Sequence, residues 1–280
     1  MQVIPDPRKA MDAVAALRAG KKTIGFVPTM GALHEGHLSL VRASVAANDI
    51  TAVSIFINPL QFGENEDLDR YPRDLEGDLR QLEAEEVDLV VTPTPGTMYP
   101  PGFCTHVEVE GMTGGLCGHF RPGHFRGVTT VVAKLFNIVR PDRAYFGQKD
   151  HQQSAVLRRM VEDLNMGIEV VVLPTVREAD GLAMSSRNLG LSGKGRSRAL
   201  ALYQALRAAE EAFSRGERDA GGLLAVARTI LDDAPGVEVQ YLEVVDADTL
   251  ESPPDMRGRT VLVAAAFVEG IRLIDNVILE

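Results

Sequence analysis

Three short segments of this chain carry side chains suited to phosphate chemistry. Residues 30–37, the histidine segment, contain two histidines three positions apart. Residues 147–150, the lysine segment, follow a glycine with a lysine, and residues 184–187, the serine segment, end in two serines and an arginine. Imidazole, ammonium and guanidinium groups can each neutralise phosphate oxygens. Taken together, the segments predict a site that activates a carboxylate with ATP.

The histidines of the first segment, His34 and His37, share one face if a helix has begun by then. A helix start offers free N–H groups and positive potential, and imidazoles there can become positive as charge builds on a phosphate. A zinc site would need a third ligand. His106, His119 and His124 have no metal-like spacing, so we expect no metal held by the protein alone. For the pair by itself, two surface histidines capping a helix is the simpler interpretation.

The other two segments also have plain alternatives. Lys149 stands at a predicted strand-to-helix turn, where a compact cation suits a phosphate, and Asp150 is a candidate N-cap. The hydroxyls of Ser185 and Ser186 and the guanidinium of Arg187 can grip a triphosphate. Seen singly, each segment would more often be solvated surface. The prediction therefore depends on all three occurring in one chain.

Two glutamines stand near these segments. Gln61 follows a buried strand, and Gln153 lies about one turn into the helix after the lysine segment. An amide can bind a hydroxyl or a carboxylate without adding charge. The acidic stretch 64–69 is interpreted as a solvated loop, with Mg²⁺ contact through one of its acids as the alternative. The basic cluster 121–126 is interpreted as a group facing either phosphates or an interface.

Composition limits the class of protein. The 280 residues include 29 basic and 39 acidic side chains, a net charge of −10, which argues against a nucleic-acid partner. Two cysteines without metal-like spacing predict free thiols in a reducing cytosol. The N-terminus lacks the apolar run of a signal peptide, and the longest apolar stretch, 261–268, is too short to span a bilayer. We expect a cytoplasmic protein with no membrane partner.

Apolar runs and amphipathic stretches alternate through the first two-thirds of the chain. The strands are expected at 23–27, 51–57, 87–91, 143–146 and 168–173, with helices near 7–19, 38–45, 75–82, 128–139 and after 150. This alternation predicts a parallel sheet with helices on both faces. Ligands of such sheets bind beyond the carboxyl ends of the strands, and His34, Lys149 and Ser185 all follow predicted strand ends.

The pattern changes beyond residue 186. Two helices, at 194–215 and 219–233, precede strands at 237–245, 260–268 and 272–279 that have no helices between them. This is the α+β signature of a second, smaller domain, and the boundary falls near 186–192. Residues 93–123, rich in Gly and Pro, give no clear element.

At these residues the chain resembles the pantothenate synthetases, the pantoate–β-alanine ligase family. The resemblance covers essentially the whole length and rests on the runs 27–37, 54–62, 146–153, 180–188 and 272–276. It implies an α/β fold: a Rossmann-like nucleotidyltransferase domain with a parallel sheet (1–186), followed by a smaller α+β C-terminal lid domain (187–280). It also implies a homodimer.

The resemblance further implies a reaction in two halves, with Mg²⁺ accompanying ATP. The pantoate carboxylate attacks the α-phosphorus of ATP and gives pantoyl adenylate and pyrophosphate. The amine of β-alanine then attacks the acyl carbon and releases AMP. The expected partners are therefore the small molecules pantoate, ATP and β-alanine.

The resemblance also implies roles for particular residues. The ATP contacts are expected from Met30, Gly31, Ala32, Leu33, His34, Glu35, Gly36, His37, Gly147, Gln148, Lys149, Asp150, Val176, Met184, Ser185, Ser186 and Arg187. His37 is the expected proton donor, with His34 and Lys149 as further catalytic groups. Gln61 and Gln153 are expected to hold pantoate, with Gln61 also near β-alanine. Gln148 stands where the family usually has Glu, so its own contribution is open.

Two other classes share part of this logic. An aminoacyl-tRNA synthetase or a cytidylyltransferase can use two histidines and a serine loop, although the acidic balance opposes tRNA binding. A nucleotide-binding sensor would carry the same segments and never turn over. Pantoate-dependent exchange of labelled pyrophosphate into ATP separates these alternatives.

Overall fold

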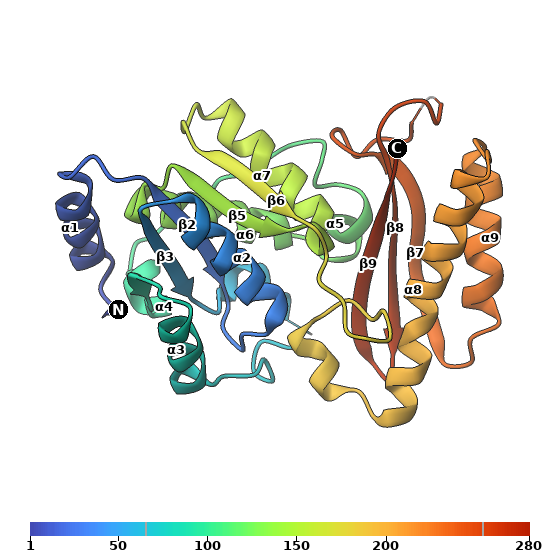
Figure 1. Cartoon of the computed structure of the whole chain (residues 1–280), viewed down its shortest axis with the longest axis horizontal. Coiled ribbons are helices and arrows are strands. Elements are labelled where there is room, and N and C mark those ends of the chain that lie inside the picture. Colours follow the sequence, from blue (N-terminus) through green and yellow to red (C-terminus); the bar gives the residue numbers. More distant parts are fainter. Residues whose placement is uncertain (65, 254) are drawn as a thin grey trace.

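The computed structural model describes residues 1–64, 66–253 and 255–280. Among them two sheets lie side by side (Figure 1). The larger sheet has six parallel strands in the order β1-β4-β3-β2-β5-β6. Its strands are β1 (Gln2–Ile4), β2 (Ile24–Thr29), β3 (Ile50–Ile55), β4 (Leu89–Val91), β5 (Arg143–Gly147) and β6 (Glu169–Leu173).

Side chains of the large sheet alternate between two cores, because successive residues of a strand point to opposite faces. The helices around it are α1 (Pro7–Arg18), α2 (Glu35–Ala47), α3 (Leu75–Ala84), α6 (His124–Val139) and α7 (His151–Asp163). In β2, Ile24 and Phe26 join the core formed with α1, α6 and α7, whereas Val27 joins the core formed with α2 and α3. Helices therefore cover both faces, which confirms the predicted α/β class.

The smaller sheet is antiparallel and lies beside the large one. It consists of β7 (Val237–Asp246), β8 (Thr260–Val268) and β9 (Ile271–Leu279) in that order. The helices α8 (Gly193–Ser214) and α9 (Ala220–Asp232) share its core, for example through Leu206, Leu223 and Leu262. In Figure 1, β9 faces the large sheet and α9 lies on the outer side. The predicted α+β C-terminal portion is confirmed, while the division at 186 stays a prediction.

Short elements account for most differences from the predicted pattern. β1, only three residues long, pairs with β4 at the edge of the large sheet and was not predicted. Residues 93–123 contain two short helices, α4 (Pro95–Met98) and α5 (Leu116–Phe120). Runs this short hold too few side chains to show a period. α6 begins four residues earlier than predicted because Gly123, at φ +81°, turns the chain into it.

In the described parts of the chain, no helix combines enough length with enough apolar character to cross a bilayer.

Candidate active site

The three segments lie at the carboxyl edge of the large sheet. The histidine segment follows β2, the lysine segment follows β5, and the serine segment lies beyond β6, and these strands are neighbours. Burial is the main cause of the low pKa of both His34 and His37, but the charge of Lys149 also lowers both. A Cβ built on Gly36 would lie 3.8 Å from Cβ of Met184. The fold therefore brings all three segments together.

The two imidazoles are fixed by the start of α2. Nδ1 of His34 accepts the N–H of Gly36 at 3.1 Å, and Nδ1 of His37 accepts the N–H of His34 at 3.3 Å. The rings stack with centroids 4.0 Å apart. Because both Nδ1 atoms are acceptors, each neutral ring carries its proton on Nε2. The pair therefore offers two Nε2–H donors from one helix start.

Both histidines are neutral at pH 7 in the free protein. Burial lowers the pKa of His37 to about 3, with the charges of His34 and Lys149 adding to the effect. Burial, and then the charge of Lys149, also lowers the pKa of His34. A phosphate placed there would add negative charge and favour the protonated rings. The arrangement can thus donate hydrogen bonds first and take up positive charge as an anion forms.

Asp78 of α3 holds the turn that carries the histidine segment. Its carboxylate, only 2% exposed, accepts the N–H of Ala32 at 2.9 Å and of Leu33 at 2.7 Å. Ala32 has φ +50°, and Gly31, at φ +82°, would bring a Cβ within 2.8 Å of Asp78 Oδ2. Burial raises the pKa of Asp78, opposed by these two hydrogen bonds. The sequence analysis missed Asp78, because nothing near position 32 points to it.

Gln61 lies beside the histidine segment. Its Nε2 is 3.1 Å from Sδ of Met30, and its Oε1 accepts Nδ2 of the buried Asn58 at 3.1 Å. The chain around Gln61 packs directly on α6, where a Cβ on Gly127 would lie 2.2 Å from the carbonyl oxygen of Leu60. Only a glycine permits this approach. The second glutamine, at position 153, is half-buried in the first turn of α7.

Two residues of the basic cluster at 121–126, Arg121 and His124, support the backbone of Gln61. Arg121 donates through Nε to Glu66 at 2.8 Å and through Nη2 to the carbonyl oxygen of Gln61 at 3.2 Å. Nδ1 of His124 lies 2.8 Å from the same oxygen, and burial lowers the pKa of His124 to about 4. The interpretation of residues 64–69 as a solvated loop is wrong at Glu66, since its carboxylate is committed to this cluster.

The serine segment is closed by a short turn. The N–H of Met184 donates to the carbonyl oxygen of Val176 at 3.0 Å, which places both ends of the turn together. Oγ of Ser185 accepts the N–H of Arg187 at 3.3 Å and begins the 3-10 helix Ser186–Gly190. The segment is thus ordered by its own backbone as well as by neighbours.

Residues of the acidic stretch and its neighbour Tyr71 contact this segment. Arg187 donates to both carboxylate oxygens of Asp67, at 2.8 Å and 3.0 Å, and Oγ of Ser186 lies 3.2 Å from the Tyr71 hydroxyl. The solvated-loop interpretation is therefore wrong at Asp67 too. A two-pronged guanidinium–carboxylate pair matches the geometry with which arginine binds phosphate. In this structure Asp67 therefore binds the Arg187 guanidinium, which was expected to bind the triphosphate.

The lysine segment is held from the small sheet. Nδ2 of Asn276 in β9 donates to the carbonyl oxygens of Gln148 and Lys149, at 3.0 Å and 2.9 Å, and Gln148 Nε2 donates to Asn276 Oδ1 at 2.9 Å. Asp150 stands at the N-cap of α7, but its side chain accepts no capping bond, contrary to expectation, because the 3-10 helix Gln148–Asp150 precedes α7. Arg121, Arg177 and Arg187 are each paired with a carboxylate, whereas within the described residues Lys149 has no such partner.

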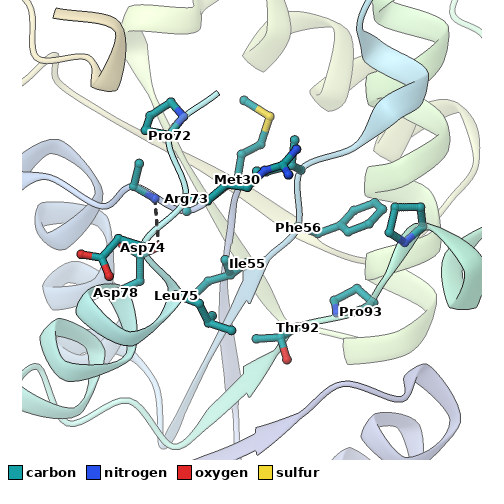
Figure 2. Close-up of a pocket in the computed structure, with 14 residues that line it drawn as sticks. Met30, Ile55, Phe56, Pro72, Arg73, Asp74, Leu75, Asp78, Thr92 and Pro93 are labelled. Carbon is teal, nitrogen blue, oxygen red and sulfur yellow. Dashed lines mark hydrogen bonds between the residues drawn. The ribbon is translucent and has the colours of Figure 1, made fainter. Parts of the chain in front are cut away.

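A cavity of about 310 Å³ adjoins the histidine segment at Met30, Gly31 and Ala32. Figure 2 shows Met30, Ile55, Phe56, Leu75 and Asp78 among its lining residues. Its walls are largely apolar and do not include His37, Lys149 or Arg187. The cavity thus borders the converged segments without containing the groups suited to phosphate chemistry.

Across residues 1–64, 66–253 and 255–280, no three His, Cys, Asp or Glu side chains gather as a metal site would require. A magnesium ion that arrives with ATP needs fewer protein ligands, because phosphate oxygens and water supply the rest. Asp150 fits such a part: its carboxylate caps no helix and its charge acts on His34.

The whole chain is similar to known proteins of one family. The sequence profile described as pantoate-beta-alanine ligase matches residues 2–278. The pantothenate synthetase of Thermotoga neapolitana is 57% identical over 263 residues, which cover 94% of each chain. That of Moorella thermoacetica is 51% identical over 280 residues, covering 100% of this chain and 99% of the relative.

Solved structures of the same kind share the whole fold. Pantothenate synthetase from Thermus thermophilus superposes with a TM-score of 0.92 at 46% identity, covering 99% of both chains. A pantoate-beta-alanine ligase from Francisella tularensis, complexed with beta-gamma ATP and beta-alanine, gives a TM-score of 0.82 at 33% identity over 99% of this chain and 97% of the other. From the profile match, the identities and the full-length fold, the chain belongs to the pantoate–β-alanine ligase family.

Proposed function

We propose that the converged segments carry out the adenylation half of pantothenate synthesis. As a member of this ligase family, the chain condenses pantoate with β-alanine using ATP and gives pantothenate, AMP and pyrophosphate through a pantoyl adenylate. A free carboxylate is a poor acyl donor, and adenylation gives it a good leaving group. What remains to be assigned is which side chains perform each step.

In the first step an oxygen of the pantoate carboxylate attacks the α-phosphorus, and the bond to the pyrophosphate oxygen breaks. Negative charge then grows on the departing phosphates. Nε2–H of His37 and of His34 and the ammonium of Lys149 meet that charge. The bound triphosphate raises the pKa of His37, and the protonated ring then gives its Nε2 proton to the departing pyrophosphate and returns to the neutral form. The observation that carries this assignment is the pair of Nδ1 atoms that accept backbone N–H groups, which leaves both Nε2–H groups as donors near Lys149.

In the second step the amine of β-alanine attacks the acyl carbon, and the acyl–phosphate bond breaks to release AMP.

Gln61 and Gln153 hold pantoate through neutral amides, so its carboxylate keeps its nucleophilic charge for the first step. Gln61 lies beside Met30, close enough to the histidine segment to serve both steps. Arg187 exchanges Asp67 for a phosphate when ATP binds, since both partners accept the same two-pronged bond. Val176, Met184 and the hydroxyls of Ser185 and Ser186 complete the nucleotide contacts.

The metal ion, the lid, the oligomeric state and the cell compartment complete the proposal. Mg²⁺ would accompany ATP, and the carboxylate of Asp150 would help to hold it; it would reduce repulsion between the triphosphate and the attacking carboxylate. Residues 187–280 act as a lid over the catalytic domain 1–186, and the enzyme works as a homodimer. The reaction takes place in the cytoplasm, in keeping with the free thiols of Cys104 and Cys117.

The test is exchange of labelled pyrophosphate into ATP. Exchange should require pantoate and should proceed without β-alanine, because only the first step is reversed. His37→Ala should abolish most of it. Exchange that needs no pantoate, or that survives the loss of His37 unchanged, would remove the assignment.

A further inference from the structure

β9 carries two adjacent buried polar residues, Asp275 and Asn276, for which the proposed reaction has no part. They are 4% and 5% exposed. A buried carboxylate or amide needs partners, because an unpaired one costs roughly 1–3 kcal/mol or more. Most of their partners are not in the small sheet. They lie about a hundred residues earlier in the chain, in the turns that form the nucleotide site.

Asn276 fixes the lysine segment. Both hydrogens of its amide are used on the backbone, at the carbonyl oxygens of Gln148 (3.0 Å) and Lys149 (2.9 Å), and its Oδ1 accepts Nε2 of Gln148 at 2.9 Å. Gln148 also lies 2.8 Å from Nδ1 of His151, whose Nε2 lies 2.9 Å from the carbonyl oxygen of Ala247. The side chain at 148 therefore faces the second sheet, which gives this position a structural role.

Asp275 fixes the turn that leads to the serine segment. Its two oxygens accept Nη1 and Nη2 of Arg177, at 2.6 Å and 3.0 Å. Arg177 follows Val176, bridges Ala183 across the turn, and donates to the carbonyl oxygen of Gly181 at 3.1 Å. A carboxylate in β9 thus sets the shape of the loop that presents Met184 to Arg187.

We propose that Asp275 and Asn276 are positioning residues for adenylation: together they set the lysine and serine segments at the spacing that receives a triphosphate. The inference rests on the proposed function, since Asn276 acts through Lys149 and Asp275 through the serine segment. ATP chemistry then depends on β9 being seated against both turns. The second half-reaction depends on it less, because the adenylate no longer carries the β- and γ-phosphates.

A double-mutant cycle tests the part played by Asn276. Asn276→Ala and Lys149→Ala are made singly and together in the full chain, and both pyrophosphate exchange and β-alanine attack on preformed adenylate are measured. Asn276→Ala should slow exchange by about 10- to 100-fold, the scale of a small misplacement, and affect the second step much less. In the Lys149→Ala background it should add little, since the group it positions is already gone.

Thr260→Val is the matched control. Thr260 is 1% exposed in the same sheet, and its hydroxyl donates to the carbonyl oxygen of Leu279, away from both turns. It should leave exchange unchanged even if it lowers thermal stability. If Asn276→Ala does not fold, Asn276→Ser replaces it in the cycle, because serine keeps only one of the two donors.

The outcomes separate the two proposals. Losses that multiply in the double mutant, or that are equal in the two half-reactions, overturn the positioning role of Asn276. A Lys149→Ala enzyme with normal exchange would instead overturn the proposed function. For Asp275, the isosteric Asp275→Asn should raise the ATP concentration needed for exchange while the second step is spared, and equal losses in both steps would count against it.

Discussion

The two sides of the nucleotide site are supported in different ways. The histidine segment is held from within the large sheet and its helices, by the cap of α2 and by Asp78 of α3. The lysine and serine segments depend on Asn276 and Asp275, in the last strand of the small sheet. One side is thus built by the large sheet and its helices alone, whereas the other is completed by β9 of the small sheet. Mutations in the two sheets should therefore affect the histidine segment and the lysine and serine segments differently.

The largest expected effect is on the side built by the large sheet. His37→Ala should lower the adenylation rate by about two to four orders of magnitude, the usual scale for a positioned proton donor or charge-stabilising contact. The fold should survive, because His37 belongs to none of the apolar clusters. Pyrophosphate exchange gives the rate, and circular dichroism gives the fold. His37→Gln, which keeps an N–H donor but cannot take up the proton, should recover only part of the loss.

Loss of Lys149 should affect the binding of ATP more than the binding of the adenylate. Lys149→Ala should slow adenylation on the order of 100-fold, because a preorganised donor to the departing phosphates is lost. Calorimetry with ATP and with preformed pantoyl adenylate should show weaker binding of ATP only. Equal losses for the two ligands would mean that Lys149 acts on the α-phosphate or on the acyl group.

The glutamines should act on pantoate rather than on ATP. Gln153→Ala should weaken pantoate binding by roughly 1.5–3 kcal/mol, the contribution of one hydrogen bond to a charged group, and should leave ATP binding nearly intact. Gln61→Ala should damage both half-reactions, since Gln61 lies against Met30 of the histidine segment. If β-alanine attack on preformed adenylate is normal in Gln61→Ala, then Gln61 serves pantoate alone.

Removal of Asp78 tests the support of the histidine segment through its effect on stability. Asp78→Ala leaves the N–H groups of Ala32 and Leu33 without their acceptor, which should lower the free energy of unfolding by about 1–3 kcal/mol. Urea titration measures this change. Asp74→Ala, one turn earlier, removes only the N-cap of α3 and is the matched control, with an expected cost of about 1 kcal/mol. Exchange should fall in Asp78→Ala well beyond any loss in Asp74→Ala.

A further effect concerns the dependence of stability on pH. The folded-state pKa of His37 is about 3 and that of His124 about 4, both lowered mainly by burial. In the unfolded chain both take up a proton near pH 6.5, so the free energy of unfolding should fall as the pH drops from 7 towards 4. NMR titration of the imidazoles should show no protonation of either ring above pH 5. ATP should raise the pKa of His37, and His124 should shift less.

Sequence reasoning predicted the parts of the molecule that depend on local periodicity. The alternation of strands and helices gave the parallel sheet, and the histidine, lysine and serine segments were found as runs of neighbouring residues. The residues that hold these segments in place were not predicted. Asp78 meets the histidine segment from 45 residues away, and Asn276 meets the lysine segment from 127 residues away. A hydrogen bond between residues far apart in the sequence produces no regular spacing, so a single sequence does not reveal it.

The same limit explains the two errors about charge. Glu66 and Asp67 look like solvated acids because they stand in a run of acidic residues, 64–69. Their partners, Arg121 and Arg187, come from other loops and meet them only in the folded chain. A helix cap at Asp150 failed for a local reason, because a 3-10 turn intervenes before α7.

The position of Asp275 and Asn276 late in the chain also bears on how the enzyme is made. A ribosome delivers the histidine, lysine and serine segments well before β9, since synthesis runs from the N-terminus. Until β9 emerges, the carbonyl oxygens of Gln148 and Lys149 and the guanidinium of Arg177 lack the partners that shape the phosphate site. The large sheet can therefore form during synthesis before β9 supplies the contacts that, in our proposal, adenylation requires.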